Sequence, residues 1–135
     1  MICPMMKVLM CKKMVNNCGC EFMGVYMLKY DKLIRDKIPD IIGKTGKKCD
    51  IEVLDDERYT KYLEQKLNEE LAEYQESKSA EELADLLEVI YAVAKQNGIS
   101  ISELESIRQK KAEERGAFDK KLLLRGVYEN GSEKI

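Results

Sequence analysis

Two acidic patterns on successive helical stretches constrain this chain most. Glu69-Glu70-x-x-Glu73 is followed by Glu82-x-x-Asp85. In a helix, a spacing of three places side chains on one face, with Cβ atoms about 5–6 Å apart. A short turn between the two helices would bring both acidic faces together. Carboxylates at that distance repel one another unless cations lie between them, and hard divalent ions such as Mg²⁺ prefer oxygen ligands. The patterns therefore predict a helix hairpin that carries a metal-binding acidic cluster.

Apolar residues at helical spacing show which face of each helix is packed. The stripe on a first helix, at about 56–77, comprises Leu63, Leu67, Leu71 and Tyr74, and that on a second, ending at Gln96, comprises Leu83, Leu86, Leu87, Ile90, Val93 and Ala94. Glu70 borders the first stripe and Glu82 lies inside the edge of the second. A carboxylate in such a position is costly without a partner. Basic partners on these faces are scarce, which favours a metal.

Two other interpretations of these carboxylates stay open. The acidic residues can form a solvated surface, which explains Glu81 better than Glu82. Alternatively, Ser79 begins the second helix and Glu82, three residues later, completes a capping box. Gly98 then provides the left-handed position that ends this helix.

Composition excludes several classes of protein. The chain has 135 residues, of which 36% are charged and 7% aromatic, as in a small, mostly helical domain. It contains no histidine, which excludes imidazole bases and His-ligated zinc. The net charge of −2 argues against a nucleic-acid polymer as the partner. Four of the five cysteines lie in the first twenty residues without a CxxC pair, so we expect reduced thiols in a cytoplasmic protein, with an N-terminal zinc or disulfide knot as the alternative.

The chain divides into three segments. Residues 1–28 hold all seven methionines, and we expect a disordered extension or a misassigned start, with translation beginning at Met23 or Met27. Lysines at positions 7, 12 and 13 argue against a membrane span there. Residues 29–128 form the predicted domain, and residues 129–135 a frayed tail.

Basic segments flank the acidic helices. Residues 30–42 contain Pro39, which favours an extended or turn-containing segment, either a solvated linker or a loop that contacts phosphate. Residues 49–54 and 120–125 are candidate short strands, the latter alternatively a docking tail. Ser102 and Glu105 have the spacing of a second capping box, which would begin a basic helix that ends at Arg115 before Gly116.

These residues together resemble the MazG-like all-α nucleoside triphosphate pyrophosphohydrolases. The two acidic patterns and the sequence ELADLLEVIYAVA at 82–94 match the metal-bearing helices of that family. KLIRDKIPDII at 32–42 and RQKKAEERGAFDKKLLL at 108–124 resemble the flanks of its small, predicted house-cleaning members. The resemblance covers about residues 30–125.

The resemblance implies an all-α bundle built around an antiparallel helix hairpin, with at most short peripheral strands, and completed as a homodimer or homotetramer. It implies hydrolysis of a canonical or noncanonical nucleoside triphosphate to the monophosphate and pyrophosphate, and no association with a membrane. By position, the ligands of Mg²⁺ (or Mn²⁺) would be Glu70, Glu73, Glu82 and Asp85, with Glu69 or Glu73 as the catalytic base. Substrate phosphates would contact Arg35, Lys37, Lys111 and Arg115. The alternatives are phosphoribosyl-ATP pyrophosphohydrolase of histidine biosynthesis and a non-catalytic helical interaction module.

Overall fold

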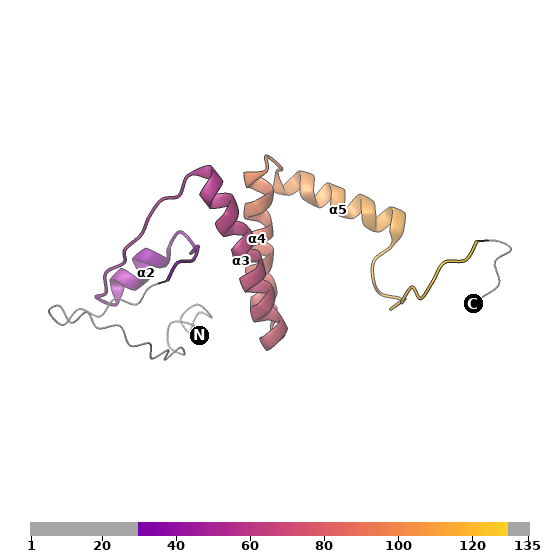
Figure 1. Cartoon of the computed structure of the whole chain (residues 1–135), viewed down its shortest axis with the longest axis horizontal. Helices are drawn as coiled ribbons and strands as arrows, with labels where there is room; N and C mark the ends of the chain where they lie inside the picture. The colour runs from indigo at the N-terminus through magenta and orange to yellow at the C-terminus, as the bar shows by residue number, and fades with distance from the viewer. Residues whose placement is uncertain (1–29, 130–135) are drawn as a thin grey trace.

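The structure, a computed structural model, describes residues 30–129. The regular secondary structure of these residues is entirely helical. Its helices are α2 (Ile38–Lys44), α3 (Asp56–Ser77), α4 (Ala80–Gln96) and α5 (Ile101–Arg115). Helices α3 and α4 lie side by side as a hairpin, with α2 on one side and α5 projecting from the other (Figure 1). The all-α class is confirmed. The expectations for residues 1–28, and for the tail beyond residue 129, fall outside the described residues.

Helix α3 has the predicted bounds because both of its ends carry local signals. The side chain of Asp55 accepts a hydrogen bond from the backbone N–H of Arg58 (2.8 Å), as an N-cap does. At the other end Lys78 adopts the left-handed conformation (φ 55°), and its N–H donates to the Tyr74 carbonyl (2.7 Å). The ammonium of Lys78 lies 5.4 Å from the centre of the Tyr74 ring, a cation–π contact that helps to offset the strain of this non-glycine position. The chain therefore reverses within two residues.

Helix α4 begins and ends where the sequence predicted. Ser79 is the N-cap, and its hydroxyl accepts from the backbone N–H of Glu82 (3.3 Å). Gly98 has φ 75°, and the N–H of Ile99 donates to the Ala94 carbonyl (2.8 Å), as in a Schellman motif. These two ends place the first turn of α4 beside the last turns of α3.

The prediction for residues 30–42 was wrong in its second half. Helix α2 begins at Ile38, and Pro39 lies in its first turn. A proline is tolerated there because its missing N–H would have no intrahelical acceptor, and its fixed φ suits a helix. The suggested strands at 49–54 and 120–125 are also wrong, since residues 30–129 contain no strand. Neither segment finds a second extended segment with which to pair its backbone.

Helix α5 ends at Arg115 as predicted but begins earlier. Its N-cap is Ser100, whose hydroxyl accepts from the N–H of Glu103 (3.1 Å). The predicted Ser102 box is therefore wrong, and its partner Glu105 instead binds Arg108 (2.5 Å). None of the helices within residues 30–129 has both the length and the apolar composition needed to cross a bilayer.

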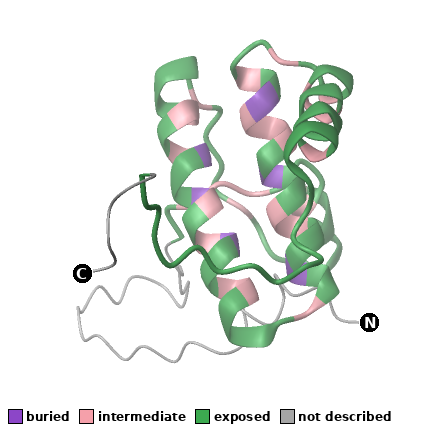
Figure 2. Ribbon diagram, turned by 90° about the vertical axis from the view of Figure 1, so that its right-hand side faces the viewer, coloured by how far each residue is buried: buried purple, intermediate pink, exposed green. Residues whose placement is uncertain are grey.

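The seam between α3 and α4 is small and half charged. Among the described residues, the buried ones are three apolar residues (Leu63, Val89 and Ala94) and three charged residues (Lys66, Glu70 and Glu82) (Figure 2). Half of the predicted α4 stripe is exposed: the exposed large residues on the hairpin are Leu71 on α3, and Leu83, Leu87 and Ile90 on α4. Glu82 thus lies on the seam itself, and a second apolar face of the hairpin is uncovered within the described residues.

Candidate metal centre

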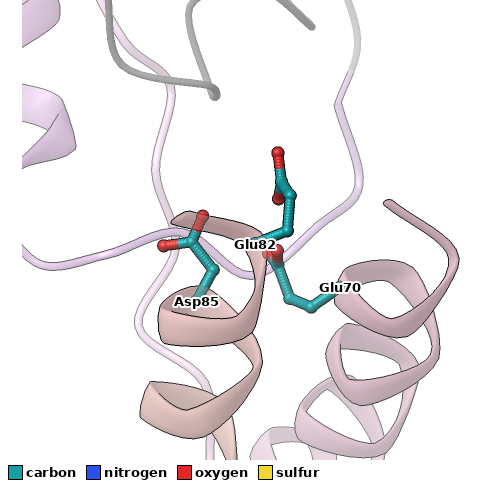
Figure 3. A group of neighbouring side chains, drawn as sticks. All are labelled: Glu70, Glu82 and Asp85. Carbon is teal, nitrogen blue, oxygen red and sulfur yellow. The ribbon is translucent and has the colours of Figure 1, made fainter. Parts of the chain in front are cut away.

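Three acidic side chains from the two helices converge at the turn end of the hairpin. Glu70 comes from α3, and Glu82 and Asp85 come from the first two turns of α4 (Figure 3). One carboxylate oxygen from each lies within 4.8 Å of the others. The tight turn causes this convergence, because it sets the end of one helix against the start of the next. The group contains only hard oxygen donors, which suit Mg²⁺ or Mn²⁺.

Two of these carboxylates are buried with an unsatisfied oxygen. Glu70 is 4% exposed and Glu82 is 8% exposed, and neither Glu70 Oε2 nor Glu82 Oε2 has a hydrogen-bond partner. A buried carboxylate oxygen without a partner is costly. Helix capping does not account for Glu82, since the N–H of Ser79 donates to Ser77 Oγ (3.3 Å) instead of to the Glu82 carboxylate. The two oxygens are therefore available for a ligand.

A buried lysine that the sequence analysis missed lies beside the cluster. Lys66 is 7% exposed, and its Nζ lies 2.9 Å from Glu70 Oε1 and 3.2 Å from Glu69 Oε1. Burial alone would lower the pKa of Lys66, but hydrogen bonds and charges from Glu70 and Glu69 raise it above the ordinary value. The expectation that basic partners were scarce on these faces is thus wrong. The spacing of Lys66 to Glu69 and Glu70, three and four residues, was the available signal.

Residues 30–37 supply two further cations to the same region. Lys32 Nζ lies 3.0 Å from Glu69 Oε1, and Arg35 Nη2 lies 2.6 Å from Asp85 Oδ1. Burial of Glu69 would raise its pKa, but the hydrogen bond from Lys32 and the charge of Lys66 lower it. Glu69 is therefore an ionised group bound by two lysines, and it lies outside the group of three converging carboxylates.

Glu73 lies next to the cluster without joining the group of three. Burial, with the negative charges of Glu70, Glu82 and Glu69, raises its pKa to about 7. The pKa of Glu82 is also raised, by burial and by the charges of Asp85 and Glu70. Burial is the first cause of both shifts, and the neighbouring negative charges act in the same direction. The structure thus brings together three of the four predicted ligands and places the fourth beside them.

These shifts predict how pH affects the stability of the metal-free protein. A carboxyl whose folded pKa is raised stabilises the fold fully below its unfolded pKa, and this contribution is lost as pH rises through the folded value. For Glu73 the window runs from the ordinary glutamate pKa of 4.5 to about 7. The melting temperature in EDTA should therefore fall as pH rises across this window. Glu73→Gln should flatten the dependence, and an unchanged profile in that variant would contradict the assignment.

The other predicted phosphate contacts lie away from the acidic group. Lys37 is exposed at the start of α2, and Lys111 and Arg115 are exposed on α5. Within residues 30–129, no ion pair joins any of these three to an acidic residue of the hairpin. Arg35 alone of the predicted basic residues contacts the acidic group.

The family resemblance drawn from the residues stays a prediction, because no family model, no curated protein and no solved structure matched the chain.

Proposed function

We propose that this protein is a Mg²⁺-dependent pyrophosphohydrolase that cleaves a nucleoside triphosphate to the monophosphate and pyrophosphate. The observation that carries the proposal is the pair of buried, unpartnered oxygens, Glu70 Oε2 and Glu82 Oε2, which come from different helices. A fold retains such groups at a cost, and a divalent cation would satisfy both. With Asp85 they would hold the ion between the helices.

The balance of charge at the turn end of the hairpin supports a divalent ion. Five carboxylates lie there, those of Glu69, Glu70, Glu73, Glu82 and Asp85. Three cations contact them, those of Lys32, Arg35 and Lys66. When all five carboxylates are ionised, two negative charges have no partner, and this is the charge that one Mg²⁺ neutralises. The internal cations thus reduce the repulsion without removing it.

The residues around the site have separate roles in the proposed reaction. When bound, Mg²⁺ would neutralise charge on both the carboxylates and the substrate phosphates. Glu73, which lies beside the three converging carboxylates, is suited to accept the proton of the attacking water. Glu69, fully engaged with Lys32 and Lys66, is suited to orienting Lys66 against Glu70. Arg35 would bind a substrate phosphate.

An open hollow between the segment of residues 30–37, α3 and α4 is a candidate place for the nucleoside. It is lined by Asp36, Tyr59, Glu88, Ala92, Lys95 and Gln96. Glu88 follows Asp85 by three residues on α4 and Asp36 follows Arg35, while Tyr59 and Gln96 lie toward the open end of the hairpin, so the hollow extends along the hairpin away from the acidic group. The ring of Tyr59 could pack on a base, while carboxylate and amide groups could accept or donate hydrogen bonds. Pocket shape of this kind, more than the metal, would select the base.

The uncovered apolar face of the hairpin indicates a further copy of the chain. Leu71, Leu83, Leu87 and Ile90 are each 38–48% exposed, although they lie on well-formed helices. Apolar surface of this kind commonly marks an interface. A homodimer or homotetramer would bury it, and the molar mass in solution tests this part of the proposal.

A panel of nucleotides tests the activity directly. The full chain should release the monophosphate and pyrophosphate in equal amounts from at least one common or base-modified nucleoside triphosphate in Mg²⁺, and none in EDTA. Release of orthophosphate in place of pyrophosphate, or no Mg²⁺-dependent release from any member, would contradict the proposal. Phosphoribosyl-ATP belongs in the panel, because its exclusive hydrolysis would indicate the histidine-pathway activity.

A further inference from the structure

We propose that residues 30–37, here called the strap, close over the metal-free site and compete with the divalent ion for Asp85. In this proposal, Arg35 exchanges its bond to Asp85 for one to a substrate phosphate. The inference rests on the metal site of the proposed function and adds to it an ordered exchange of cations.

The strap is bound to both helices at the level of the acidic cluster. Lys32 binds Glu69 on α3 (3.0 Å), and Arg35 binds Asp85 on α4 (2.6 Å). Asp85 is also one of the three converging carboxylates. Arg35 of the strap thus binds a predicted metal ligand, Asp85, while Lys32 binds Glu69, the residue next to Glu70. No other segment of residues 30–129 outside the hairpin forms ion pairs with the cluster.

Besides the two ion pairs, the partial burial of Leu33 and Ile34 retains the strap in this position. The guanidinium-bearing side chain of Arg35 is 51% exposed, and α2, which follows the strap, contains no buried residue. Leu33 and Ile34 are only half-buried. An exposed ion pair favours its closed state by a factor of only about 1.5 to 5. The closed strap is therefore stable enough to be populated in the metal-free protein and weak enough to be displaced.

Charge determines the direction of the exchange. A divalent ion ligated by Asp85 would lie close to the Arg35 guanidinium, and the two cations would repel each other. Binding of one must then weaken binding of the other by the same factor, since such coupling is reciprocal. A bound triphosphate reverses the effect, because its oxygens accept bidentate hydrogen bonds from arginine. Arg35 would return to the site on the nucleotide instead of on Asp85.

Titration of the nucleotide-free full chain with Mn²⁺, followed by calorimetry, tests the competition. Removing the closed state should tighten the apparent Kd of Arg35→Gln by about two- to sixfold, because affinity is reduced by the fraction of competent protein. Arg108→Gln is the matched control, since Arg108 also forms an exposed pair, with Glu105, but on α5. Its Kd should equal that of the wild type. Lys32→Gln, which opens the other end, should shift the Kd in the same direction if Arg35→Gln fails to fold.

Limited trypsin digestion of the wild type is a second measurement. It reports opening of the strap itself, and so it separates opening from the loss of a positive charge in Arg35→Gln. Mn²⁺ should speed cleavage of the wild type after Lys32 and Arg35, relative to cleavage after Arg125 in the exposed C-terminal segment. Addition of a triphosphate with a non-hydrolysable α,β-methylene bridge should slow it again.

The outcomes separate the two proposals. The strap proposal is overturned, and the metal site stands, if the wild type binds Mn²⁺ and Arg35→Gln binds it no more tightly. The same conclusion follows if Arg35→Gln binds Mn²⁺ more tightly but Mn²⁺ does not change the tryptic cleavage of the wild type. If neither the wild type nor Arg35→Gln binds Mn²⁺, both proposals fall.

Discussion

Glu82→Gln should abolish pyrophosphate release and at the same time stabilise the metal-free protein. Glutamine keeps the size of the side chain but removes the charge that a divalent ion requires. The loss should be at least about a hundredfold, since even groups that only orient metal ligands commonly contribute about 10- to 100-fold. The gain in stability follows from the raised pKa of Glu82, which reports burial and repulsion by Asp85 and Glu70.

Glu81→Gln is the matched control for this experiment. Glu81 is the preceding residue on α4, carries the same charge and is exposed. It should change neither the rate nor the melting temperature appreciably. Pyrophosphate release in Mg²⁺ and thermal melting in EDTA are the two measurements. If Glu82→Gln hydrolyses the nucleotide at the wild-type rate, Glu82 is not a metal ligand. If Glu82→Gln has a lower melting temperature than the wild type in EDTA, the charge of Glu82 does not destabilise the metal-free protein.

Lys66→Met should strongly reduce the free energy of unfolding. Methionine fills similar volume but leaves the carboxylate of Glu70, 4% exposed, without its cation. Breaking a buried ion pair by removing one partner costs about 3–5 kcal/mol. The cost should be near the lower end, about 3 kcal/mol, because Glu70 can take up a proton in response. Urea unfolding in EDTA measures it.

Two variants make this result specific. Lys61→Met removes a lysine one turn earlier on α3, whose pair with Glu57 is exposed, and should change stability by no more than about 0.5 kcal/mol. The double variant Lys66→Met with Glu70→Leu should recover most of the stability, since an apolar pair can replace a buried ion pair. If Lys66→Met is as stable as Lys61→Met, the lysine is not held in the seam as described.

A helix end was predictable from the sequence wherever one local signal, such as a cap, defines it. Asp55, Ser79 and Gly98 each act on atoms within a few positions of themselves, so no distant contact is needed. The same reasoning failed where two local signals compete. Ser100 and Ser102 both have a glutamate three residues later, and α5 begins at the first because it follows the turn at Gly98 directly.

The candidate site was predictable in part for the same reason. Glu82 and Asp85 share a helical face by spacing alone, and a short turn brings Glu70 towards them. Lys66 precedes Glu69 and Glu70 by three and four residues, so helical spacing alone could have predicted these pairs, although not their burial. The contacts of Lys32 and Arg35 span 37 and 50 residues, and no local pattern reports them.

By itself, the sequence determined that residues 56–96 form a helix hairpin with carboxylates gathered at its turn, because capping, turn geometry and helical spacing are short-range effects. Only the tertiary structure decided which carboxylates are buried, which oxygens lack a partner and which cations neutralise the rest. Burial and ion pairing depend on the distance through space between residues far apart in the chain, and these distances exist only once the helices have packed.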